Sequence, residues 1–179
     1  DAIYFGTAGS NMRANSANNS TLDDLHKTAE YCHENGLKSY LTVNTVIYDN
    51  DIETMHKIIQ AAKEAKISAI IASDMAAILY ARSIGVEVHI STQVNISNSE
   101  AVRFYSQYAD VVVLARELNL EQVYNIHQNI LKEDIRGPHG EQVRIEMFCH
   151  GALCMAVSGK CYMSLHEMNR SANRGACGQ

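Results

Sequence analysis

The chain has 179 residues, of which 46% are hydrophobic and 20% are charged, with a single proline. This composition is typical of one globular domain, and the length is too short for two ordinary ones. The formal net charge of −5 gives no electrostatic sign of a nucleic-acid surface. There is no signal-peptide pattern and no apolar run of the roughly 18–20 residues that a membrane helix needs, so we expect a cytoplasmic protein without membrane association.

Runs of β-branched and apolar residues predict six strands, separated by segments with helical apolar periodicity. The clearest helical stripes lie within Ile52–Ala62 and Leu120–Ile130. The six strands are predicted at Ala2–Phe5, Ser39–Thr45, Ala69–Ala72, Val86–Ser91, Val111–Ala115 and Val143–Cys149.

Strands that alternate with helices predict right-handed βαβ units and a parallel sheet. Polar residues follow the carboxyl ends of these strands, which is where (β/α)₈ barrels carry their active sites. An open doubly wound sheet is the alternative, but its functional groups gather at one switch point. We therefore predict an α/β fold with an incomplete TIM-like barrel. Because six strands are too few for a complete barrel, we expect residues 1–179 to be a single fragment that lacks the first βα unit and C-terminal parts.

Eight polar residues near the strand ends are candidates for the functional site. Amide side chains there hydrogen-bond to ligands or merely close turns. Arginine can clamp phosphate or carboxylate groups, although a solvated loop arginine is commoner. A carboxylate inside a barrel needs a partner, and for Glu146 we expect Arg116. The candidate substrate contacts are Asn11, Arg13, Asn44, Gln93, Asn95 and Arg116, and the candidate catalytic residues are His150 and Glu146.

Four of the five cysteines lie in the C-terminal part of the chain. Without a secretory signal, such a group indicates a metal site before disulfides, and buried inert cysteines are the alternative. The spacings C-x₄-C, C-x₆-C and C-x₁₅-C differ from those of zinc ribbons and bacterial ferredoxins. The clustered residues are Cys149, Cys154, Cys161 and Cys177, whereas Cys32 stands alone on a predicted helix.

The segment from Glu146 to Ser164 reads EMFCHGALCMAVSGKCYMS. It resembles the signature of peptidase family U-32, E-x-F-x-x-G-[SA]-hydrophobic-C-x₄-G-x-C-x-hydrophobic-S, at every fixed position. Further segments also resemble the family, so that the resemblance covers essentially the whole chain. These segments are Asp1–Gly6, Asn11–Asn15, Val43–Thr45, Ser91–Asn95, Leu114–Leu118 and Asn173–Gln179.

This resemblance implies an incomplete TIM-like barrel with a 4Fe–4S cluster in a cysteine-rich segment, residues 143–179. It assigns Cys154, Cys161 and Cys177 as cluster ligands and places the fourth cysteine ligand outside this chain. Cys149 falls on a variable position of the signature, so no ligand role is assigned to it. Family members are described either as collagenolytic peptidases or as enzymes that hydroxylate RNA bases or ubiquinone without molecular oxygen.

The sequence motifs help to decide between a peptidase and a hydroxylase. The chain has neither a G-x-S-x-G nor an H-E-x-x-H motif, and the neighbours Cys149 and His150 point to opposite faces of a strand. We therefore predict oxygen-independent hydroxylation of tRNA or rRNA bases, with RNA as the partner of the full-length protein. The alternatives are a collagenase-like peptidase and a non-catalytic zinc-stabilised module that uses His150. Unpaired barrel edges also predict self-association of the fragment.

Overall fold

The computed structural model describes residues 1–7, 22–151, 154, 156–157 and 161–178. The strands are β1 (Ala2–Gly6), β2 (Lys38–Val43), β3 (Ala69–Ala72), β4 (Val88–Ile90), β5 (Val111–Val113) and β6 (Arg144–Glu146). The α-helices are α1 (Leu22–Glu34), α2 (Ile52–Glu64), α3 (Met75–Ser83), α4 (Ser99–Ser106), α5 (Leu120–Lys132) and α6 (Met163–Met168). Short 3₁₀ helices occur at η1 (Asp49–Asp51), η2 (Thr92–Val94) and η3 (Ala172–Arg174).

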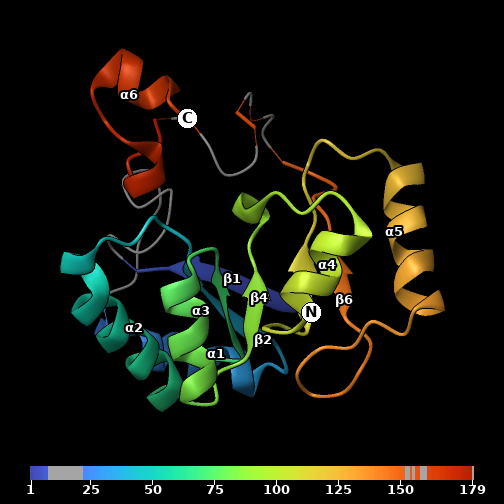
Figure 1. The fold of residues 1–179 in the computed structure, drawn as a ribbon. Coiled ribbons are helices and arrows are strands. Elements are labelled where there is room, and N and C mark those ends of the chain that lie inside the picture. Colours follow the sequence, from blue (N-terminus) through green and yellow to red (C-terminus); the bar gives the residue numbers. More distant parts are fainter. Residues whose placement is uncertain (8–21, 152–153, 155, 158–160, 179) are drawn as a thin grey trace.

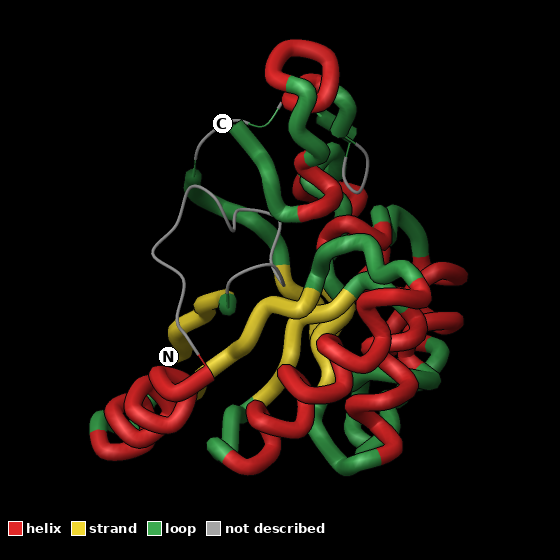
Figure 2. Tube along the Cα trace, turned by 90° about the vertical axis from the view of Figure 1, so that its left-hand side faces the viewer, coloured by secondary structure: helices red, strands yellow, loops and turns green. Residues whose placement is uncertain are grey.

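The six strands form one parallel sheet in the order β1-β2-β3-β4-β5-β6. Each strand therefore pairs with its neighbours in the chain, and the order never reverses as it does in a doubly wound sheet. The sheet is curled into a half-barrel, with helices packed along its outside (Figures 1 and 2). The predicted incomplete TIM-like barrel is confirmed.

The two faces of this sheet differ in chemistry. On the outer face, Leu41, Val43, Ile70 and Ile90 are fully buried against the helices, as part of one continuous apolar core. Burying each of these side chains contributes about 1.5–3 kcal/mol, which makes this face the main source of stability. Because side chains alternate along a strand, the neighbouring positions face the hollow of the half-barrel.

The predicted Ile52–Ala62 stripe is confirmed in α2, where Met55, Ile58, Ile59 and Ala62 are buried. The predicted strand Val143–Cys149 is too long, because β6 ends at Glu146. Its partner β5 ends at Val113, and the backbone N–H of Leu114 makes the following hydrogen bond, to the carbonyl oxygen of Glu146 at 2.9 Å. Cys149 and His150 therefore lie in an exposed loop after the sheet.

The described part of the C-terminal segment lies above the carboxyl ends of the strands, as the position of α6 in Figure 1 shows. Its anchor is η3. The backbone N–H of Val46, in the loop after β2, donates to the carbonyl oxygen of Asn173 at 3.0 Å. Arg174 donates to the carbonyl oxygen of Val46 and to Asp51. Among the described residues, no helix combines the length and apolar character needed to cross a membrane.

Candidate functional site

A pocket of about 250 Å³ opens at the carboxyl ends of β2, β3 and β4. Parallel barrels place their active sites at this rim. Asp74 caps α3 by accepting from the backbone N–H of Ala76 at 2.9 Å, which fixes one wall. Asn173 of the C-terminal segment also lines the pocket. The lining residues are Asn44, Val46, Ser73, Asp74, Gln93, Val94, Tyr105 and Asn173.

Two of the predicted substrate contacts, Asn44 and Gln93, line this pocket. Asn95 and Arg116 are exposed and are not among its lining residues. Asn95 has a φ of 61°, a left-handed conformation that asparagine tolerates well, and it ends η2. Asn11 and Arg13 lie outside the described residues.

His150, one of the two predicted catalytic residues, lies in the exposed loop after β6 and does not line the pocket. His150 and the residues Asn44 and Gln93 therefore do not line the same pocket in the described structure. The reason is the early end of β6, which removes His150 from the row of strand ends.

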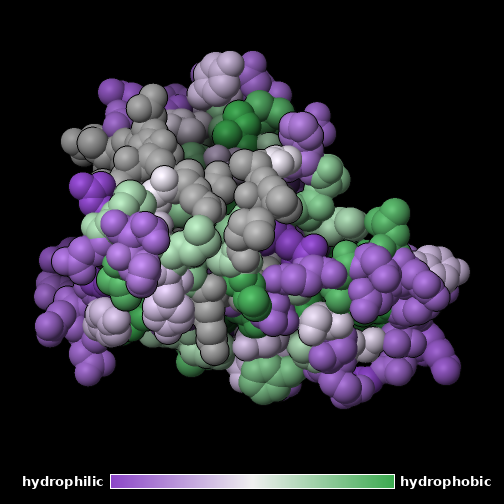
Figure 3. All heavy atoms as spheres, turned by 90° about the horizontal axis from the view of Figure 1, so that it is seen from above, coloured by the Kyte–Doolittle hydropathy of each residue, from purple (hydrophilic) through white to green (hydrophobic). Residues whose placement is uncertain are grey.

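Seen from above, the surface of the molecule is mostly hydrophilic, with hydrophobic residues in small groups (Figure 3).

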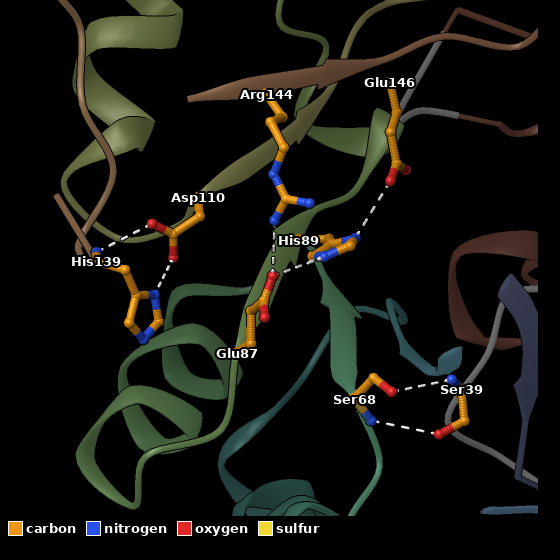
Figure 4. A network of polar contacts seen from close by, with 8 residues as sticks. All are labelled: Ser39, Ser68, Glu87, His89, Asp110, His139, Arg144 and Glu146. Atoms are coloured by element: carbon orange, nitrogen blue, oxygen red, sulfur yellow. Dashed lines mark hydrogen bonds and ion pairs between the residues drawn. The ribbon is translucent and has the colours of Figure 1, made fainter. Parts of the chain in front are cut away.

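A second cluster of polar side chains occupies the hollow face of the sheet (Figure 4). His89 of β4 is 1% exposed, with its Nε2 3.3 Å from Glu87 Oε1 and its Nδ1 3.5 Å from Glu146 Oε1. Arg144 Nη2 lies 3.1 Å from the same Glu87 oxygen. The Tyr40 ring of β2 packs on the imidazole, with 4.5 Å between ring centroids. We call these five residues the inner-face cluster.

The inner-face cluster alters the ionisation of its members. Burial acts to lower the pKa of His89, but the contacts with Glu146 and Glu87 outweigh it and raise that pKa above its ordinary value. The hydrogen bond from His89 lowers the pKa of Glu87. Burial, followed by the charges of Glu146 and Glu87, raises the pKa of Tyr40. A clustering of shifted pKa values is typical of functional sites.

Glu146, the other predicted catalytic residue, thus belongs to this cluster. Its ion-pair partner is His89, in place of the expected Arg116, because the pleat directs the side chains of β4 and β6 onto the same face. At 3.5 Å the contact is at the limit of a hydrogen bond, and His89 Nδ1 has no other hydrogen-bond partner in the described structure.

The predicted metal ligands Cys154, Cys161 and Cys177 are partly exposed, and Cys32 is buried in α1 as expected. Over the described residues, no three His, Cys, Asp or Glu side chains are grouped as a metal site requires.

The model of Peptidase family U32 matches residues 1–179. The chain therefore belongs to the U32 peptidase family. It is 69% identical over its whole length to a collagenase of Porphyromonas gingivalis, of which it covers 43%. It is 38% identical, again over its whole length, to the 23S rRNA 5-hydroxycytidine C2501 synthase of Escherichia coli, of which it covers 25%.

The fold has a solved counterpart in the structure of a U32 peptidase, with a TM-score of 0.61. That match covers 82% of this chain and 59% of the other at 14% identity, which supports the fold alone. The chain thus spans less than half the length of the curated relatives it matches. Identity is higher to the collagenase than to the RNA-modifying enzyme, the reverse of the order that the sequence motifs favoured.

His89 and Asn173 were not among the predicted site residues. Most of the predicted residues follow a strand, whereas His89 lies within one. A signal was present, because Glu87 and His89 alternate with Val86, Val88 and Ile90 in the predicted strand. Polar residues at every second position indicate a polar face, even inside a barrel. No local pattern indicated Asn173, which reaches the pocket only through tertiary contacts.

Proposed function

We propose that this chain is part of a U32 enzyme that cleaves polypeptides of the collagen type. The observation that carries the proposal is the 69% identity, over all 179 residues, to a protein named collagenase. This conclusion replaces RNA hydroxylation, which the sequence motifs favoured, as the leading function.

The charge of the chain supports a polypeptide substrate. The net charge is −5, and carboxylates lie at both candidate sites, Asp74 in the pocket and Glu87 and Glu146 in the inner-face cluster. RNA carries a negative charge on every phosphate, and proteins that bind it usually present basic surfaces. A neutral polypeptide meets no such repulsion.

Cleavage of gelatin and of a triple-helical Gly-Pro-Pro peptide by the purified full-length protein tests the proposal. New amino termini should appear with time, and a heat-inactivated sample should release none. Mass spectrometry of nucleosides from a deletion strain, beside the parent strain, tests the alternative. A missing hydroxylated nucleoside together with intact gelatin would reject the peptidase.

RNA-base hydroxylation is the second candidate function, supported by the identity of 38% to the rRNA synthase and by the cysteine signature. We propose for this case that Cys154, Cys161 and Cys177 bind a 4Fe–4S cluster with a fourth ligand outside this chain. Iron and sulfide analysis of anaerobically purified full-length protein tests it. Alanine at any of the three cysteines should remove the bound iron, and Cys32→Ala should retain it.

A further inference from the structure

The inner-face cluster is unusual for the interior of a barrel. Complete parallel barrels fill this space mainly with Val, Ile and Leu. Here three strands direct an imidazole, two carboxylates, a guanidinium and a phenol into it. Buried and half-exposed ion pairs contribute little to stability, because desolvation or screening by solvent offsets most of their attraction. Stability therefore does not explain why these residues meet.

Exposure separates the members of the cluster into different roles. The His89 side chain is 1% exposed, so it cannot touch a substrate. The Glu146 side chain is 44% exposed and ends β6 at the rim that carries barrel active sites. Arg144 is 51% exposed as well, but a guanidinium cannot accept a proton. Glu146 is therefore the accessible carboxylate at this rim, and His89 is the buried group that contacts it.

The charged neighbours of His89 support its role as the buried partner of Glu146. Glu87 accepts from both His89 and Arg144, and Lys38 adds a further positive charge near Glu87. Tyr40 covers the imidazole from β2. Held between two carboxylates, the imidazole favours its protonated form. A buried imidazolium 3.5 Å from Glu146 Oε1 holds that carboxylate in a fixed direction.

We propose that Glu146 is a catalytic acid–base residue of this enzyme and that His89, held by Glu87, is its positioning residue. This assignment rests on the proposed peptidase function, so the substrate is a peptide amide. Glu146 takes a proton from a water molecule whose oxygen attacks the carbonyl carbon. The C–N bond then breaks with its electron pair on nitrogen, and nitrogen takes the proton from Glu146. Amide and water become carboxylic acid and amine, without an oxidant or reductant.

Steady-state cleavage of gelatin by full-length variants tests the catalytic role. Glu146→Gln keeps the size of the side chain but removes the base, and it should lower kcat at least about 100-fold. Glu146→Asp should retain part of the activity. Glu121→Gln, the same change on exposed helix α5, is the matched control and should leave kcat unchanged.

Separate measurement of kcat and KM tests the positioning role. His89→Gln should lower kcat about 10- to 100-fold through misplacement of the carboxylate. KM should change little, because His89 is buried and does not contact the substrate. A merely structural histidine would lower the fraction of folded enzyme and the melting temperature without lowering kcat per folded molecule.

Nuclear magnetic resonance of the ¹⁵N-labelled imidazole provides a readout that needs no activity. In the wild-type protein His89 should lose its proton at a higher pH than an ordinary histidine, and Glu146→Gln and Glu87→Gln should each lower its pKa. Intact gelatin with wild-type enzyme would reject the peptidase function. An unchanged His89 titration in Glu146→Gln, or more than about a tenth of wild-type kcat in that variant, would reject the acid–base assignment.

Discussion

Arg174 fastens the C-terminal segment to the barrel rim. Its guanidinium donates to both carboxylate oxygens of Asp51, and Nη1 also donates to the carbonyl oxygen of Val46 at 2.7 Å. The Tyr48 ring lies 4.6 Å from its central carbon. The hydrogen bond from Arg174 lowers the pKa of Asp51, which keeps the carboxylate charged. The neighbouring Asn173 lines the rim pocket, so this contact also sets one of its walls.

We predict that Arg174→Lys releases this segment while the barrel stays folded. An ammonium cannot reproduce the paired hydrogen bonds of a guanidinium, nor stack on Tyr48 in the same way. Limited proteolysis should cut the variant faster between Met163 and Cys177, with a melting temperature close to that of the wild type. Arg170→Lys, the same change on an exposed neighbour, should be cut at the wild-type rate.

His89 shows why the sequence predicted the rim better than the hollow face. Residues after strands can be found from strand boundaries, and in this way Asn44 and Gln93 were placed at one pocket. The contact between His89 and Glu146 depends on the curl and register of the sheet. So does the contact between Glu87 and Arg144, which are 57 residues apart in the sequence. Such pairings follow from tertiary structure, which no local pattern contains.

The loop between α5 and β6 is held against the amino end of β5 by a buried carboxylate. Asp110, 7% exposed, accepts from the backbone N–H of His139 at 3.0 Å and pairs with His139 Nδ1 at 2.6 Å. Gly137 passes so close that a Cβ there would lie 2.4 Å from Asp110 Oδ1, so the position requires glycine. This loop therefore packs on the sheet through polar contacts.

We predict that this contact stabilises the protein more at acidic than at alkaline pH. The hydrogen bond with Asp110 raises the pKa of His139 above its ordinary value. Its contribution is complete below the ordinary pKa of about 6.5 and is lost as the pH rises through the higher folded-state pKa. Because the His139 ring is largely exposed, the coupling should be at most about 1 kcal/mol.

Urea unfolding of wild type, His139→Gln, Asp110→Asn and the double variant gives this coupling as a double-mutant cycle. The coupling energy measured at about pH 6 should exceed that at about pH 9, on either side of the titration. A coupling that stays constant, or that grows as the pH rises, would contradict the prediction.

The elements themselves were predicted from the sequence to different degrees. β3 agrees at both ends, since Ala69–Ala72 is a short apolar run between turns. The order and parallel direction of the strands also followed from their alternation with helices. The end of β6 could not be predicted, because Met147 and Phe148 continue the apolar pattern beyond Glu146, the last residue that pairs with β5. Leu120 is 73% exposed despite its place in the predicted stripe of α5, where it follows the Asn119 cap.

The half-barrel as a whole exposes two strand edges. Within the described residues, β1 pairs with β2 and β6 pairs with β5, and the order of the sheet leaves the outer side of each unpaired. Ile3 and Tyr4 of β1 are 40% and 69% exposed. By contrast, β6 carries the charged residues Arg144 and Glu146, which discourage pairing with another chain. Of the two edges, β1 is therefore the one that pairs more readily with a strand of another chain.

We predict that the 179-residue chain, produced on its own, self-associates through β1 as its concentration rises. An open apolar edge offers unpaired N–H and C=O groups as well as exposed side chains to a second copy. Light scattering after size-exclusion chromatography should show a mass above that of the 19.8 kDa monomer. Ile3→Lys places a charge on the edge and should shift the population towards monomer. Leu120→Lys makes the same change on exposed helix α5 and should not. Equal effects of the two substitutions would mean that association depends on general hydrophobicity, and a monodisperse monomer at every concentration would show that β1 is not adhesive.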